Sequence, residues 1–279
     1  MSAFLAMVGK QLKESRWPLG ISAAALFGLS WLTVYSTAWT ESEVRKASQE
    51  GMFLQRFRMM RALGGSGMDF SSAAIETTFW MHPMILLPVV IWALSRGTAA
   101  PAGEVEKGTL DLTLSRPVSR SSYLGSQVVV AVFGLAALVG ALVVGNVIGT
   151  RFNAIEAPPS AARLVRPALN LAALGLVMYA YTVMLSALDS VRWRPNMIAS
   201  SFTLASYIGK VISVLPFFED ASWRPWLERS TIFTAYDPVD AVGKASSLTT
   251  HLSVLGGIGL VCIVLAFVAF QWRDLPASS

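Results

Sequence analysis

The chain has 279 residues, of which 54% are hydrophobic and 14% are charged. This composition excludes an ordinary soluble domain, and its long apolar runs predict an all-α integral membrane protein, because helices satisfy their own backbone hydrogen bonds inside a bilayer. The net charge of +5 is scattered among the apolar runs, which favours anionic membrane lipids over nucleic acid as the counterpart. We expect a single transmembrane domain over residues 1–279.

An interfacial helix and a first membrane span are predicted at the start of the chain. Residues 1–16 carry apolar side chains at helical spacing, with basic side chains away from that stripe, and are expected to form the interfacial helix. Residues 17–38 form the first span. A cleaved signal peptide is the alternative, but its apolar region would be about 7 to 15 residues long, shorter than this run. A polar outer loop over residues 39–80 follows.

Five further spans are predicted, which makes six in total. The second covers residues 81–100 and carries Arg96 near its end, where a long side chain can reach the headgroups. A second outer loop, residues 216–251, is rich in aromatic residues, as suits a segment at the membrane interface. The other four spans are expected at residues 123–149, 168–188, 196–215 and 252–271.

The basic residues favour a cytoplasmic position for both termini, which six spans place on the same side. Lys10, Lys13 and Arg16 directly precede the first span, and the segments on their side of the membrane are short and therefore denser in basic residues. We expect a multi-pass protein of the cell (plasma) membrane, with residues 104–120 in the cytoplasm.

Motifs for ATP binding and for catalysis are missing from the sequence. Neither Gly209-Lys210 nor Gly243-Lys244 has the preceding glycine of a Walker A loop. The chain also has neither an H-E-x-x-H nor a G-x-S-x-G pattern. We therefore expect a transport subunit rather than an enzyme, and an energy source outside this chain.

The charged stretch between the second and third spans, "EVEKGTLDLTLSRPVSR", predicts two helices separated by a break. Residues 104–114 can form a helix of about three turns with acidic residues near its N-terminus. The alternation in "TLDLTL" would also fit a strand, but no other segment reads as its pairing partner. Pro117 disfavours a helical conformation at Arg116, and Ser119 is a candidate N-cap for the next helix. The alternative is a solvated loop anchored by its arginines.

The longer stretch "GEVEKGTLDLTLSRPVSRSSYL" resembles the cytoplasmic loop of the ABC-transporter type-2 permease family. Members of that family carry a Glu, then Gly-Thr-Leu, a short apolar-acidic helix, and Pro-Val-Ser-Arg before the third span. Val105 and the pair Ser126-Gln127 depart from the residues common in relatives. Some members of this broad family serve copper-enzyme maturation. The matching residues in this sequence are Glu104, Gly108, Thr109, Leu110, Asp111, Leu112, Leu114, Ser115, Pro117, Val118, Ser119 and Arg120.

The resemblance implies that this loop is a coupling helix that docks in a groove of a separate ATP-binding subunit. ATP and Mg would bind on that partner, with no cofactor in this chain, and two permease copies, identical or similar, would pair in the membrane to form a transporter, expected to be an exporter. Charged groups would give directional contacts and the leucines buried area. The alternative is a membrane anchor or scaffold whose ATPase does mechanical or assembly work. The coupling residues implied are Glu104, Glu106, Gly108, Thr109, Leu110, Asp111, Leu114, Arg116, Pro117, Ser119 and Arg120.

The fifth span is the most polar and, by resemblance, faces the midline of the dimer together with the second. Lys210 either extends toward the outer headgroups or lines a polar path, and serine and threonine can also serve ordinary helix packing. The candidate path residues are Ser200, Thr203, Ser206, Tyr207 and Lys210.

A weak soft-metal candidate lies at the start of the second span. It consists of Met81, His82 and Met84, joined by His251 if the second and sixth spans are neighbours. Methionines at the edge of a span are more often lipid-facing. We therefore predict no metal site.

Overall fold

The computed structural model describes residues 3–49, 78–115, 118–155, 158–218, 220–243 and 245–273. Within these ranges the chain contains helices and no strand, which confirms the all-α class. Five of the described helices are long and apolar enough to cross a membrane, and α5 is a shorter apolar helix of 17 residues. The six are α1 (Ala3–Gln49), α5 (Pro83–Ala99), α8 (Arg120–Phe152), α9 (Ala161–Leu188), α10 (Trp193–Val214) and α13 (Ala245–Trp272).

Short helices fill much of the chain between the long ones. The predicted second outer loop, residues 216–251, is largely helical, and its last residues already belong to α13. Residues 50–77 of the other predicted outer loop lie outside the described residues. The short elements are α4 (Thr78–Met81), α6 (Ala102–Glu106), α7 (Thr109–Leu114), η1 (Pro216–Phe218), α11 (Arg224–Ser230), η2 (Ile232–Ala235) and α12 (Pro238–Gly243).

The structure has no boundary between an interfacial helix and a first span. A single helix, α1, begins at Ala3 in the predicted interfacial helix, continues through the predicted span 17–38, and ends at Gln49. The proline inside it, Pro18, removes one backbone hydrogen bond, and a long helix can accommodate that loss when a neighbour supports it. The interfacial position of residues 1–16 stays a prediction, but the predicted start of the outer loop at residue 39 is wrong, because residues 39–49 belong to α1.

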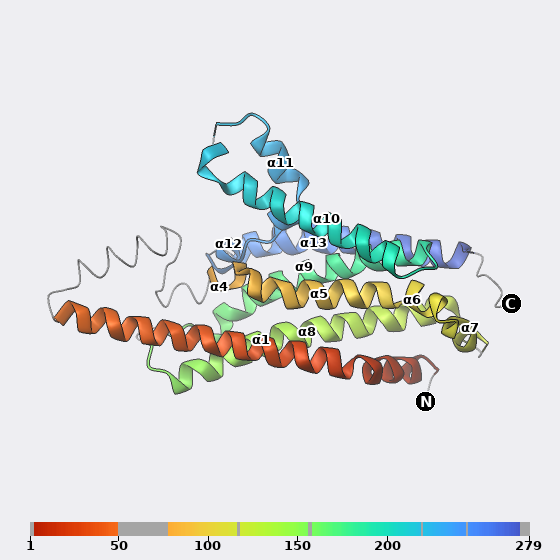
Figure 1. The fold of residues 1–279 in the computed structure, drawn as a ribbon, viewed down its shortest axis with the longest axis horizontal. Coiled ribbons are helices and arrows are strands. Elements are labelled where there is room, and N and C mark those ends of the chain that lie inside the picture. Colours follow the sequence, from red (N-terminus) through yellow and green to blue (C-terminus); the bar gives the residue numbers. More distant parts are fainter. Residues whose placement is uncertain are drawn as a thin grey trace.

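The centre of the bundle is α9, the most deeply buried of the long helices. It contacts α5, α8, α10, α12 and α13, while α1 lies along α8 on the outside (Figure 1). Small residues allow α1 and α8 to approach closely: the Ser30 hydroxyl donates to the Leu142 carbonyl over 2.8 Å, and Gly145 faces the backbone of Phe27.

One end of the bundle holds both ends of the described chain. The start of α1, the helices α6 and α7, the turn between α9 and α10, and the end of α13 all lie there (Figure 1). The other end carries α4, α12 and the C-terminal part of α1. We call the first of these the knuckle end, after the helix pair α6 and α7. Because both ends of the described chain lie at the same end of the bundle, the arrangement agrees with an even number of membrane crossings.

Candidate functional site

The charged stretch forms two short helices, α6 and α7, joined by Lys107 and Gly108. Gly108 has a φ of 65°, the left-handed region that glycine adopts without steric cost. The predicted single helix over residues 104–114 is therefore wrong, because the glycine breaks it. The Thr109 hydroxyl donates to the Glu104 carbonyl over 3.3 Å and closes the corner. We call residues 102–115 the knuckle.

The predicted cap of the next helix is confirmed. The Ser119 hydroxyl accepts a hydrogen bond of 3.1 Å from the backbone N–H of Ser122, with Ser119 in an extended conformation. The break predicted at Arg116 and Pro117 lies outside the described residues. The helix before it, α7, ends at Leu114.

The candidate coupling residues are divided between an inner and an outer face of the knuckle. Leu110 is only 1% exposed and belongs to the hydrophobic core, against which Leu114 also packs. Leu112, between them, is 70% exposed. Glu106 and Gly108 are also exposed, whereas Glu104 is half-buried. Thr109, Asp111 and Arg120 are of intermediate exposure and Ser119 is exposed.

Arg192, in the turn between α9 and α10, holds the knuckle to the bundle. Its backbone N–H donates to the Glu106 carboxylate over 2.8 Å, while its guanidinium donates to the Thr98 hydroxyl over 3.3 Å and to the Ser95 carbonyl over 3.2 Å. The Ser186 hydroxyl of α9 accepts the N–H of Ala102 over 3.0 Å. From the sequence, Arg192 counts only as a basic residue of a charged turn; its role depends on contacts between residues far apart in the chain.

Arg120 and Arg273 close the C-terminal ends of two long helices. Nη1 of Arg120 donates to the carbonyls of Phe270, Gln271 and Arg273, at 3.1, 3.2 and 2.7 Å. Nη1 of Arg273 donates to the carbonyls of Ala187 and Asp189 at the end of α9. Such contacts suit the negative ends of helices. Arg120 therefore serves the junction of α8 and α13.

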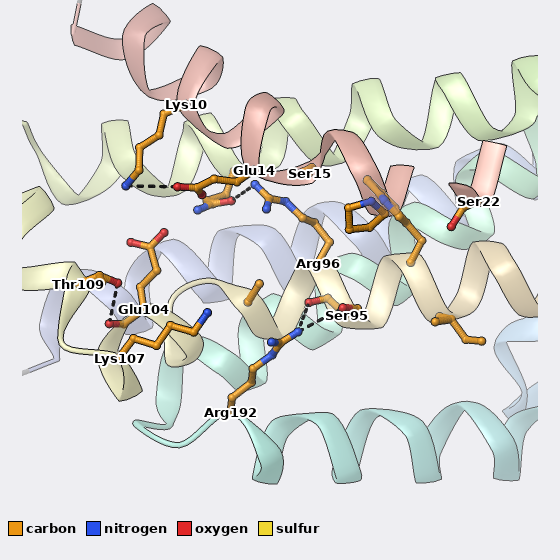
Figure 2. Close-up of a pocket in the computed structure, with 15 residues that line it drawn as sticks. Lys10, Glu14, Ser15, Ser22, Ser95, Arg96, Glu104, Lys107, Thr109 and Arg192 are labelled. Carbon is orange, nitrogen blue, oxygen red and sulfur yellow. Dashed lines mark hydrogen bonds and ion pairs between the residues drawn. The ribbon is translucent and has the colours of Figure 1, made fainter. Parts of the chain in front are cut away.

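A cavity of about 620 Å³, lined by both charged and apolar side chains, lies between α1, α5 and the knuckle. Figure 2 shows Arg96 pointing across it, between α5 and α1. Its guanidinium donates to Gln127 over 2.5 Å and to Gln11 over 3.4 Å. Arg96 thus turns inward, and its predicted extension to the headgroups is wrong, because two buried glutamine side chains offer it acceptors. Burial raises the pKa of the Glu104 carboxyl above its ordinary value, and nearby Lys10 opposes that shift.

Four of the five candidate path residues pack against other parts of their own chain. Thr203 and Ser206 are buried, and Tyr207 packs edge-on against Phe233. The Thr203 hydroxyl shares a short hydrogen bond with Tyr181 of α9. Nζ of Lys210, which is mostly buried, lies 3.5 Å from a carboxylate oxygen of Glu228 in α11. Ser200 lines a smaller cavity of about 490 Å³, next to Arg192.

The weak metal candidates have structural partners. His82 caps α5, where its Nδ1 accepts from the N–H of Met84 over 3.3 Å. His251 lies 3.5 Å from Asp240. Met81 and Met84 are exposed, and α9 contacts both α5 and α13. Within the described ranges, no three His, Cys, Asp or Glu side chains are placed to hold a metal ion together.

Comparison with known families decides what kind of membrane protein this is. The family model described as ABC-2 family transporter protein matches residues 10–275, which include the knuckle and nearly all of the long helices. The chain belongs to the ABC-2 transporter family. No curated protein matches it. As an ABC-2 protein it is a multi-pass membrane protein and a permease subunit of an ABC transporter, a membrane component that pairs in general with an ATP-binding cassette subunit.

Proposed function

We propose that this ABC-2 permease subunit is driven by a separate ATP-binding subunit that docks on the outer face of the knuckle. The observation that carries the proposal is the 70% exposure of Leu112, on a helix whose other two leucines pack inward. The exposed Leu112 and the exposed Lys107 of the same knuckle together offer apolar area and a charged group, the composition expected of a docking anchor. ATP and Mg bind on the partner.

The inner face of the knuckle transmits the motion of the docked subunit into the spans. Support comes from Leu110 in the core, from Ala102 bonded to α9, and from Arg192 bonded to both Glu106 and the end of α5. Because these contacts reach three long helices, a displacement of the knuckle is resisted by packed side chains and carried to α5, α9 and α10.

The knuckle end lies in the cytoplasm in this proposal, with both termini, and the protein resides in the cell membrane. Two permease subunits, identical or similar, pair above two ATPase subunits, and solute is exported between them. The exposed apolar side chains of α5 and α10, among them Ile91, Met197 and Phe202, supply surface for lipid or for a second subunit.

The test is co-purification from detergent with an ATP-binding cassette subunit expressed together with this protein. Leu112→Asp places a charge in the docking site and should abolish co-purification, while the protein inserts and folds normally. Leu188→Asp is the matched control, because Leu188 is 66% exposed and ends α9, next to the turn that leads to α10, but is outside the knuckle. Unchanged association in Leu112→Asp, or equal loss in both variants, would contradict the docking site.

Transport is tested separately in sealed vesicles that contain the purified complex. ATP-dependent movement of solute toward the side opposite the ATPase supports export. Coupled ATP turnover without any solute movement would instead support the anchor or scaffold function, in which the same docking drives mechanical work.

A further inference from the structure

The cavity between α1, α5 and the knuckle has a charged end and an apolar end. Lys10, Glu104 and Lys107 lie at one end of it, Ser22 lies at the other, and Arg96 is between them (Figure 2). From Lys10 to Ser22 the wall follows α1 for about 18 Å. Beyond the charged end the lining is formed by Pro18, Ile91 and Trp92. A ligand that fills this space must itself be polar at one end and apolar at the other.

The lining of the cavity as a whole carries more positive than negative groups. Four cationic side chains line the cavity against two carboxylates, Glu14 and Glu104. Glu14 lies 3.7 Å from Lys10, an exposed pair that solvent screens. The excess of positive charge favours an anionic ligand. The cationic residues are Lys10, Arg96, Lys107 and Arg192.

Two ionisable side chains on the cavity wall each keep a polar atom without a partner among the described residues. These buried atoms are Nε of Arg96, a donor, and Oε2 of Glu104, an acceptor. An unpaired buried atom of a charged group costs free energy. A ligand with a phosphate and a hydroxyl group would accept from the first and donate to the second, after a small rotation of the side chains.

We propose that this cavity binds one anionic phospholipid of the phosphatidylglycerol type. Its phosphate lies among Lys10, Arg96 and Lys107, its glycerol headgroup reaches Glu104, and an acyl chain follows the apolar wall toward Ser22. A volume of about 620 Å³ lies within the range of ordinary ligand cavities, about 300–1,000 Å³, and suits the headgroup with the first part of a chain. Because the knuckle forms one wall of the site, a bound lipid ties α1 and α5 to the proposed coupling element.

The binding test compares two double variants of the full-length protein by native mass spectrometry in detergent. Lys10→Gln with Lys107→Gln removes two charges from the cavity without altering a buried contact. Lys13→Gln with Arg16→Gln removes the same charge from exposed positions of α1 outside the lining. Affinity for phosphatidylglycerol should fall by about tenfold or more in the first double variant, because charge-assisted contacts with the phosphate are lost. It should fall much less in the second double variant. Equal losses in both pairs overturn the site.

The identity of the ligand is tested with the wild type and with Ser22→Phe, which fills the apolar end. Phosphatidylglycerol should raise the unfolding temperature more than phosphatidylcholine or soluble glycerol phosphate does, and Ser22→Phe should reduce that gain. If glycerol phosphate stabilises the protein equally and Ser22→Phe has no effect, the cavity takes a soluble anion and the lipid proposal is wrong. Equal stabilisation by phosphatidylcholine also overturns it. This test uses the permease alone, so its outcome is independent of ATPase docking.

Discussion

The backbone N–H of Arg192 donates a 2.8 Å hydrogen bond to the Glu106 carboxylate, so the turn between α9 and α10 is joined directly to the knuckle. The same residue reaches the end of α5 with its guanidinium. One arginine thus connects the turn between α9 and α10 with the end of α5 and with the knuckle, both of which lie more than eighty residues earlier in the chain. The two charged groups differ in what they contribute: Glu106 supplies an acceptor to the backbone, while the side chain of Arg192 supplies the fork of donors.

Arg192→Gln should uncouple the ATPase without releasing it. The variant keeps the backbone bond to Glu106 but loses the guanidinium contacts with Ser95 and Thr98, worth about 1–3 kcal/mol together. We expect normal co-purification, a lower unfolding temperature, and reduced stimulation of ATP turnover. Arg194→Gln is the control, because that exposed arginine in the same region lies 4.0 Å from Asp189 and is only weakly paired. Full stimulation in Arg192→Gln would contradict a coupling role.

Gly145→Ala should separate α1 from α8. A Cβ at Gly145 would lie 2.6 Å from the Phe27 carbonyl oxygen, and backbone atoms cannot rotate away as a flexible side chain can. Overpacking of this kind costs about 1–3 kcal/mol, so the unfolding temperature in detergent should fall. Gly140→Ala in the same helix meets nothing within 4 Å and should be tolerated. Similar stability of the two variants would show that the helices are less tightly packed than described.

Glu104→Gln should change how stability depends on pH. Burial raises the pKa of this carboxyl above 4.5, so in the wild type its stabilising effect is fully present below about pH 4.5 and is lost as pH rises through the folded-state pKa. The glutamine mimics the protonated form. We expect equal unfolding temperatures near pH 4 and a more stable variant at pH 7–8. A variant that is less stable at neutral pH would mean that the ionised carboxylate contributes a favourable contact.

Lys210→Glu should loosen α11 from α10, because it places two carboxylates where the structure has an ion pair with Glu228. Glu228 is nearly half exposed, so the native pair is worth at most about 1 kcal/mol and the main effect of the substitution is repulsion. The exchange Lys210→Glu with Glu228→Lys should recover most of the lost unfolding temperature. If transport stays impaired in the recovered double variant, Lys210 also has a role in the path.

Helix number and one helix start could be predicted from the sequence because their causes are local. Runs of apolar residues reveal the spans, and a serine before a helix marks the cap at Ser119. The break at Gly108 could not be distinguished from a continuous helix, since glycine tolerates several conformations and its neighbours decide among them. The burial of Leu110 and the exposure of Leu112 depend on how the knuckle packs on the bundle. Periodicity alone does not show which side of so short a helix faces inward.

The inward orientation of Arg96 is a second feature that the sequence does not predict. An arginine near the end of a span is expected at the headgroups, yet Gln11 and Gln127 hold it inside the bundle. Those acceptors come from helices that are 85 and 31 residues away in the chain. Only the tertiary arrangement brings them together, so no local pattern could have predicted the inward turn.

The unbroken course of α1 has a mechanical consequence. A helix of 47 residues is about 70 Å long, much longer than the roughly 30 Å hydrocarbon core of a bilayer. It is therefore longer than a single crossing needs, and it runs along the full length of the bundle (Figure 1). Tilting such a helix by about 5° about one end shifts the other by about 6 Å. A small rotation next to the knuckle would thus appear on the opposite side of the membrane as a displacement about as large as one helical turn.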